Sequence, residues 1–91
     1  MGRFIKKGDL VYLTETNSIG FIIDKGTDNG NEWSRTDVDG VRDDSDLIKI
    51  TKHEEIVTLI MKHGVIFIAP STKSAINKHF NIEVFDEKLL V

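Results

Sequence analysis

Acidic side chains cluster in the stretch from residue 32 to residue 50, and their spacing raises the question of calcium binding. Calcium prefers carboxylate oxygens, which an EF-hand loop supplies from alternate positions of twelve residues. With Arg35 at the first position, the third, fifth, ninth and twelfth positions hold Asp37, Asp39, Asp43 and Asp46. However, the first position needs a carboxylate, and strand-like rather than helical segments flank the loop. We therefore expect no metal site and no cofactor.

The same carboxylates could contact a basic protein surface, because charge complementarity steers and orients protein association. A tryptophan and an arginine precede them, and both residue types are enriched in interface hot spots. The alternative, a tryptophan in the core of a small barrel, has equal weight because this side chain is usually well buried. The candidate partner-binding residues are Trp33, Arg35, Asp37, Asp39, Asp43 and Asp44.

Nucleic acid is the alternative partner. Its candidate contacts are the cations Arg3, Lys6, Lys7 and Lys25, to which Arg35 can be added. The net charge of −3 does not favour it, because phosphate neutralisation drives non-specific nucleic-acid binding. Residues 1–51 hold seven Lys/Arg and ten Asp/Glu, giving −3, whereas residues 52–91 hold five of each.

Catalytic patterns are weak, and we predict that the chain is not an enzyme. Ser71 and His79 lie about two turns apart on one predicted helix, without the Gly-x-Ser-x-Gly elbow of a serine hydrolase. The chain has no cysteine, which excludes disulfides and cysteine-ligated zinc and fits a cytoplasmic protein. No apolar run is long enough to span a membrane, and no signal-peptide pattern follows Lys6 and Lys7.

Short strands in residues 1–51 must position the candidate binding side chains. Strand-like segments occupy residues 10–13, 19–23, 32–36 and 47–50, and residues 25–31 have the composition of a loop. Gly20 within the second segment predicts a bulge or a close backbone approach. Asp39-Gly40 predicts a type I′ hairpin turn, with Val38 and Val41 as a cross-strand pair beside it.

The second half changes to helical periodicity. Thr51 and Glu54 have the spacing of a capping box, and they open a helix over residues 52–62 with a wide apolar face. An apolar strand follows at residues 65–69, predicted to be covered on both faces. Ser71 or Thr72 can cap a second helix that reaches about His79, and residues 82–85 alternate as a strand.

Four segments together resemble an SH3-like small β-barrel of the KOW kind. They are Gly8-Asp9-Leu10-Val11-Tyr12, Gly20-Phe21-Ile22-Ile23, Val38-Asp39-Gly40-Val41 and Asp46-Leu47-Ile48-Lys49-Ile50. The resemblance covers about the first half of the chain and implies a binding module, with nucleic acid as one partner class. The compact, acidic, cysteine-free chain is also similar in style to small accessory proteins of bacteriophages.

The sequence therefore predicts an α+β fold, with an N-terminal SH3-like β-barrel in residues 1–51. A helix-strand-helix-strand extension over residues 52–91 is expected to dock on this barrel. The predicted function is that of a non-enzymatic accessory or regulatory protein, which binds a basic partner protein through a barrel face and the acidic hairpin. The alternative is a KOW-like module associated with DNA or RNA in transcription or translation.

Overall fold

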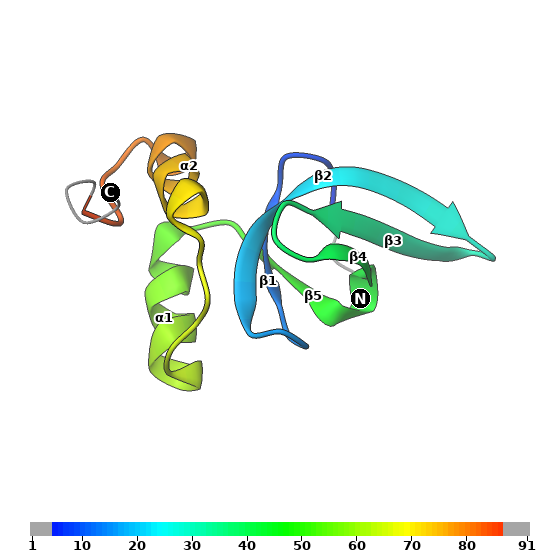
Figure 1. The fold of residues 1–91 in the computed structure, drawn as a ribbon, viewed down its shortest axis with the longest axis horizontal. Coiled ribbons are helices and arrows are strands. Elements are labelled where there is room, and N and C mark those ends of the chain that lie inside the picture. Colours follow the sequence, from blue (N-terminus) through cyan, green and yellow to red (C-terminus); the bar gives the residue numbers. More distant parts are fainter. Residues whose placement is uncertain (1–4, 87–91) are drawn as a thin grey trace.

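An antiparallel sheet and two helices make up the computed structural model, which describes residues 5–86 (Figure 1). The elements are β1 (Leu10–Leu13), β2 (Ser18–Asp28), β3 (Asn31–Thr36), β4 (Gly40–Asp43), a 3₁₀ turn (Asp44–Asp46), β5 (Leu47–Ile50), α1 (His53–His63) and α2 (Pro70–Phe80). The five strands follow the order β4-β3-β2-β1-β5. The α+β class is confirmed, but the sheet is not closed into a barrel, since β4 and β5 lie at its two edges.

Strand β2 is long because it pairs with two neighbours in succession. Its first residues pair with β1, and its later residues pair with β3 to form a hairpin that projects away from the helices (Figure 1). The register shifts between Ile22 and Asp24, so a bulge at Gly20 is wrong. The alternative prediction for Gly20, a close approach of another segment to its backbone, is confirmed. A Cβ atom there would lie 2.6 Å from Asp37 Oδ1 and 2.6 Å from Val38 Cγ2.

The tight turn lies at Asn29-Gly30 and not at Asp39-Gly40. Asn29 and Gly30 both have positive φ, 51° and 84°, as a type I′ turn requires. At the predicted turn, only Gly40 has positive φ, and the connection from β3 to β4 takes three residues. The Val38–Val41 pair is also wrong, because Val41 lies opposite Arg35.

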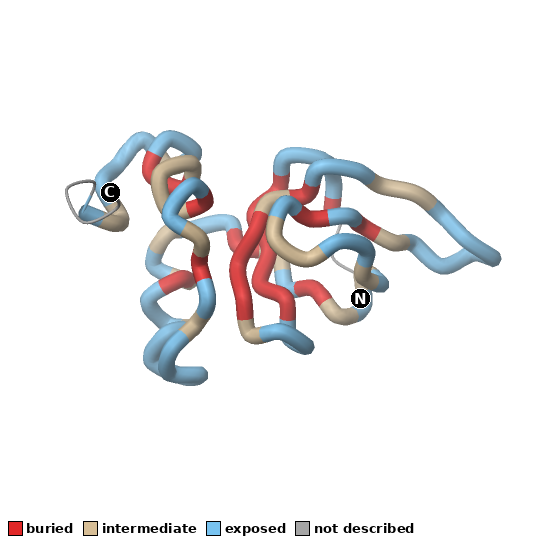
Figure 2. Tube along the Cα trace, in the orientation of Figure 1, coloured by how far each residue is buried: buried red, intermediate tan, exposed pale blue. Residues whose placement is uncertain are grey.

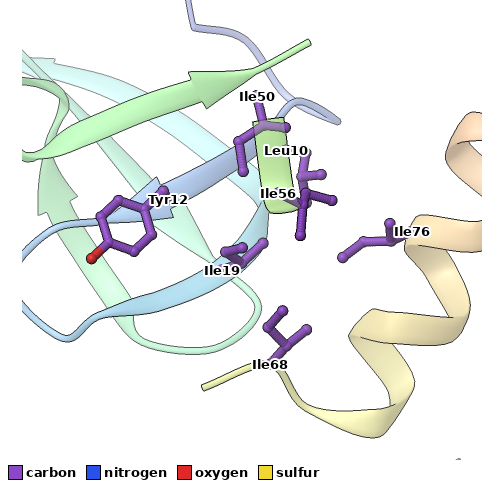
Figure 3. Close-up of a cluster of buried hydrophobic side chains, with 7 residues drawn as sticks. All are labelled: Leu10, Tyr12, Ile19, Ile50, Ile56, Ile68 and Ile76. Carbon is purple, nitrogen blue, oxygen red and sulfur yellow. The ribbon is translucent and has the colours of Figure 1, made fainter. Parts of the chain in front are cut away.

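The sheet is buried on both faces at β1, which explains the unbroken apolar run of this strand. Val11 and Leu13 contribute to one cluster of buried side chains. The opposite face joins the helices in a second cluster, made of Leu10, Tyr12, Ile19, Ile50, Ile56, Ile68 and Ile76 (Figure 3). Buried positions concentrate around β1 and the helix faces that contact the sheet (Figure 2). The helices and the sheet therefore share one core.

The two predicted strands of the second half do not form. Residues 65–69 make a single bridge to β2, in which the Phe67 N–H donates to the Asn17 carbonyl at 3.0 Å and the Ile19 N–H donates to the Phe67 carbonyl at 3.1 Å. This segment is not covered on both faces, since Val65 and Phe67 are exposed. Residues 82–85 form bends instead of a strand, and the Asn77 side chain holds them by donating to the Phe85 carbonyl and accepting from the Phe85 N–H.

Helix α1 lies within a residue of its predicted bounds, whereas α2 begins at least two residues before its predicted start. Pro70 occupies the first position of α2, after the N-cap Ala69, so neither Ser71 nor Thr72 caps this helix. Proline is tolerated there because the first helical N–H groups have no intrahelical acceptor. Of the apolar residues predicted to dock from α1, only Ile56 is buried and Leu59 half-buried. Within residues 5–86, neither helix has the length and apolar character needed to cross a membrane.

Glu55, and not Thr51, organises the start of α1. The N-cap is Lys52, one residue later than predicted. Glu55 Oε1 accepts hydrogen bonds from the backbone N–H groups of Thr51 at 2.7 Å and Lys52 at 2.9 Å, and from the Thr51 hydroxyl at 3.1 Å. Thr51 lies one residue too early for its hydroxyl to cap the helix, so the predicted pairing with Glu54 is wrong.

We expect Glu55→Ala to lower the free energy of unfolding by about 1–2 kcal/mol, because it removes the acceptor of these bonds and a favourable charge from the helix N-terminus. Urea denaturation followed by circular dichroism measures the change. Thr51→Ala, the matched variant at the predicted cap, should cost less than about 0.5 kcal/mol. The reverse order of the two costs would restore Thr51 as the cap.

Candidate functional site

One face of the β2–β3–β4 sheet gathers Trp33 with several charged side chains. Residues directly opposite each other in antiparallel strands have side chains on the same face. Trp33 lies opposite Gly26 and Asp43, and Arg35 lies opposite Asp24 and Val41. We call this surface the Trp33 face, and it consists of Asp24, Gly26, Asp28, Asn31, Trp33, Arg35, Val41 and Asp43.

Trp33 lies across the backbone of Gly26, and a larger residue at that position would displace the indole ring. A Cβ atom on Gly26 would lie 2.1 Å from Cζ2 and 2.3 Å from Cε2 of the indole, a distance that no real contact shows. The glycine therefore lets the ring lie against the hairpin. Trp33 is half-buried, so it is neither a fully buried core residue nor a freely exposed one, and part of its ring stays accessible.

Carboxylates outnumber cations on the Trp33 face. Asp24, Asp28 and Asp43 are exposed, and Arg35 is the single cation among the residues of this face. Within residues 5–86, none of the three carboxylates forms an ion pair. A shallow depression at the hairpin end of the face is lined by Asp28 and Asp43 together with Trp33 and Val41. Arg42, which is paired with Asp39, also lines it, so a partner that enters this depression would meet an aromatic ring, two carboxylates and one guanidinium.

Two of the predicted acidic contacts serve the fold instead. Asp37 Oδ1 accepts a hydrogen bond from the Phe21 N–H at 2.9 Å and so fixes the β3–β4 connection against β2. Asp39 accepts from Arg42 Nε at 2.8 Å, and this hydrogen bond raises the pKa of the Arg42 guanidinium above its ordinary value. Arg42 also approaches Glu15 at 3.3 Å. Asp37 and Asp39 are therefore engaged within the chain.

Asp44 lies on the opposite face of the sheet from Asp43. Its carboxylate accepts a hydrogen bond from the hydroxyl of the buried Ser34 at 2.5 Å and forms an ion pair with Lys25. Lys25 Nζ also donates to Ser34 Oγ at 3.1 Å and approaches Glu32 at 3.4 Å. The side chains of Lys25 and Asp44 are only 18% and 17% exposed. The Lys25–Asp44 ion pair is therefore largely covered by the protein and presents little charge to a partner.

The predicted nucleic-acid contacts do not come together in the part of the chain that the structure describes. Arg3 lies outside the described residues. Lys6 and Lys7 are exposed before β1, and the Lys6 N–H donates to Asp9 Oδ2 at 2.9 Å. Lys25 faces Asp44 and Arg35 lies on the other face, opposite Asp24.

The histidines of α1 and α2 contact aromatic rings and do not form a metal or catalytic cluster within residues 5–86. In the described chain, residues 5–86, no three histidine or acidic side chains gather as a metal site would need. His63 stacks on Tyr12 with ring centroids 5.0 Å apart, and His79 contacts the edge of Phe21 at 5.5 Å. Both histidines are exposed, and each contacts one aromatic ring of the sheet from a helix.

Sequence reasoning missed Asp24, Gly26, Asp28 and Val41 on the Trp33 face. It treated residues 25–31 as a loop, and a loop has no strand register that could place side chains on a common face. Asn29-Gly30 was the available signal, since Asn-Gly is a preferred type I′ dipeptide. Applied there, the hairpin rule would have paired Gly26 with Trp33.

Comparisons of the chain with protein families, with curated proteins and with solved structures gave no match.

Proposed function

We propose that this chain is a protein-binding module, and that its Trp33 face binds an extended, positively charged segment of another protein. The observation that carries the proposal is the placement of a half-buried tryptophan among carboxylates that have no ion-pair partner within residues 5–86. The predicted basic partner is kept, but Asp24, Asp28 and Asp43 replace Asp37, Asp39 and Asp44 as its acidic contacts.

The chemistry of this face favours lysine and arginine side chains. A cation over an indole ring is attracted by the ring quadrupole, and tryptophan is the best of the aromatic residues for this contact. Asp28 and Asp43 border the same depression and can accept hydrogen bonds from the cation. Such charge-assisted bonds are shorter and stronger than neutral ones. An extended segment could place alternate side chains along the hairpin.

The proposal includes an SH3-like relationship for the strands. Support comes from the strand order β4-β3-β2-β1-β5, from the division of β2 between two neighbours, and from the 3₁₀ turn before β5. It also assigns the chain an accessory or regulatory role, in which binding and not catalysis is the activity.

Intrinsic fluorescence can test the proposal directly, because Trp33 is the only tryptophan of the chain. The probe is a set of lysine- and arginine-rich peptides, titrated at low salt. Saturable change of the Trp33 emission is expected for basic peptides and not for acidic ones. Asp28→Asn with Asp43→Asn should weaken this binding by roughly tenfold, and added salt should weaken it further, since exposed charges are screened.

The matched control is Glu83→Gln with Asp86→Asn, which removes the same charge from exposed positions away from the Trp33 face and should leave the affinity within about twofold. If the two double variants weaken peptide binding equally, the effect comes from net charge alone, and this result would contradict binding at the Trp33 face. A single-stranded oligonucleotide in a parallel titration tests the alternative. Tighter oligonucleotide binding by the Asp28→Asn, Asp43→Asn variant would support nucleic acid instead, because the change removes phosphate repulsion.

A further inference from the structure

Helix α1 exposes large apolar side chains on the face that points away from the sheet. Ile56 is fully buried, whereas Val57 is 52% exposed and Met61 is 82% exposed. Val57 and Met61 are four residues apart in the helix, so they are neighbours on its surface. The outer turns of α1 are coloured as exposed in Figure 2. We call Val57 and Met61 the α1 stripe. Neighbouring apolar side chains that stay exposed are typical of interaction surfaces.

Charge accompanies this stripe along one edge. Glu54, Thr58 and Lys62 follow one another at intervals of four residues, so they lie in a row beside Val57 and Met61. Glu54 is exposed, and its carboxylate approaches His53 at 3.7 Å. Lys62 is exposed and forms no ion pair within residues 5–86. The row therefore has an acid at one end and a base at the other.

This pattern is complementary to itself when two helices run antiparallel. Eight residues of helix separate Glu54 from Lys62 by about 12 Å along the axis. A two-fold axis near Thr58 brings Glu54 of each copy opposite Lys62 of the other. The same axis sets Val57 of each copy within reach of Met61 of the other. An interface of this kind uses the same patch on both subunits, as two-fold dimers do.

The distribution of charge over the chain also favours contact between two copies of α1. Residues 52–91 carry five Lys/Arg and five Asp/Glu, so two helical halves can meet without net repulsion. The acidic excess of −3 lies in residues 1–51. The tip of the β2–β3 hairpin and helix α1 lie at opposite ends of the molecule (Figure 1), so docking through α1 keeps the acidic hairpins apart.

We propose that a second copy of this chain covers the α1 stripe, and that the two α1 helices pack antiparallel in a two-fold dimer. This surface is distinct from the Trp33 face, so either assignment can fail without the other. A single pair of short helices buries less area than a standard interface, and the dissociation constant is expected to be weak, on the order of 100 µM.

Sedimentation equilibrium over a concentration series tests the proposal with the full chain. The wild type should pass from monomer to dimer as its concentration rises. Met61→Lys should raise the dissociation constant by at least about tenfold, because it places a charge in the apolar stripe. Ile23→Lys is the matched control, since Ile23 is 49% exposed on β2, and it should leave the dimer intact. Equal loss of dimer in both variants would contradict the use of α1.

A charge exchange tests the antiparallel arrangement. Glu54→Lys and Lys62→Glu, each alone, should weaken the dimer by about fivefold, because each sets like charges opposite one another. An equimolar mixture of the two variants should recover the wild-type affinity, since unlike charges then meet at both ends. Recovery in the mixture cannot come from a change in helix stability, which mixing leaves unaltered. A wild-type chain that stays monomeric at about 1 mM would overturn the proposal and assign the stripe to a different protein.

Discussion

Ile56→Ala is expected to lower the free energy of unfolding by about 3–4 kcal/mol. Truncation of a large buried aliphatic residue loses its transfer free energy and leaves a cavity, which together cost 2–5 kcal/mol. Ile56 is fully buried in the cluster that joins α1 to β1, β2 and β5 (Figure 3). The loss is a large fraction of the stability of a chain of this size.

Two probes show whether the helices and the sheet unfold together. Circular dichroism follows the helices, and the fluorescence of Trp33 follows the sheet, because this tryptophan is the only one and lies on β3. The shared core predicts coincident transitions that both shift in Ile56→Ala. A shift in the helical signal with an unchanged Trp33 transition would show that the helices dock as a separate unit.

Val57→Ala is the control on the same helix. Val57 is one residue away but 52% exposed, so its truncation should change stability by less than about 0.5 kcal/mol. Ile56→Val is the milder variant if Ile56→Ala does not fold, and it should cost about 1 kcal/mol.

Periodicity in the sequence was enough to place most elements of this fold. The apolar run of β1 and the helical spacing of residues 52–63 each reflect contacts with a core, and both elements form. The exposed half of the β2–β3 hairpin gave no such signal, because residues 25–32 are polar on both faces and contact no core there. Its turn at Asn29-Gly30 was therefore assigned to a loop.

Burial was harder to predict than helix or strand propensity. Residues 65–69 form an apolar run and were predicted to be a covered strand, yet Val65 and Phe67 are exposed. An apolar run shows only that side chains could be buried. Whether they are depends on what the rest of the chain brings over them. The same limit applies to α1, where the sequence predicted one wide docking face and the structure buries only its Ile56 side.

The candidate site was predicted in part, because adjacent residues can point to opposite faces. The sequence treats Asp43 and Asp44 as one acidic patch. In the structure Asp43 lies opposite Trp33 on the exposed face, while Asp44 meets Ser34 and Lys25 on the other. That separation depends on a contact between residues 19 positions apart in the chain, which no local pattern shows. A change at both positions would alter folding as well as binding, so the binding experiment changes Asp28 and Asp43 and leaves Asp44 intact.

Asp44→Ala is expected to lower the free energy of unfolding by about 2–3 kcal/mol. The carboxylate accepts a hydrogen bond from Ser34, which is fully buried, and it pairs with the ammonium of Lys25. Its removal leaves a buried hydroxyl without this acceptor and a poorly solvated cation without its main counter-charge. An unsatisfied buried polar group costs 1–3 kcal/mol, and more when it is charged.

Asp43→Ala provides the matched control, since it removes the same side chain one residue earlier. Asp43 is exposed and forms no ion pair within residues 5–86, so its loss should change stability by less than about 0.5 kcal/mol. Urea denaturation at low and high salt measures both variants. The effect of Asp44→Ala should persist at high salt, because salt screens partly buried pairs much less than exposed ones.

A double-mutant cycle separates the Lys25–Asp44 pair from its surroundings. Lys25→Met with Asp44→Ala removes both charges, so the cation that Asp44→Ala alone leaves unpaired is no longer present. We expect the double variant to be more stable than Asp44→Ala by about 1 kcal/mol, because breaking one side of a buried pair costs more than removing the pair. Additive losses in the cycle would mean that Asp44 stabilises the sheet through Ser34 alone. Equal stability of the Asp43→Ala and Asp44→Ala variants would contradict the assignment of these two aspartates to opposite faces.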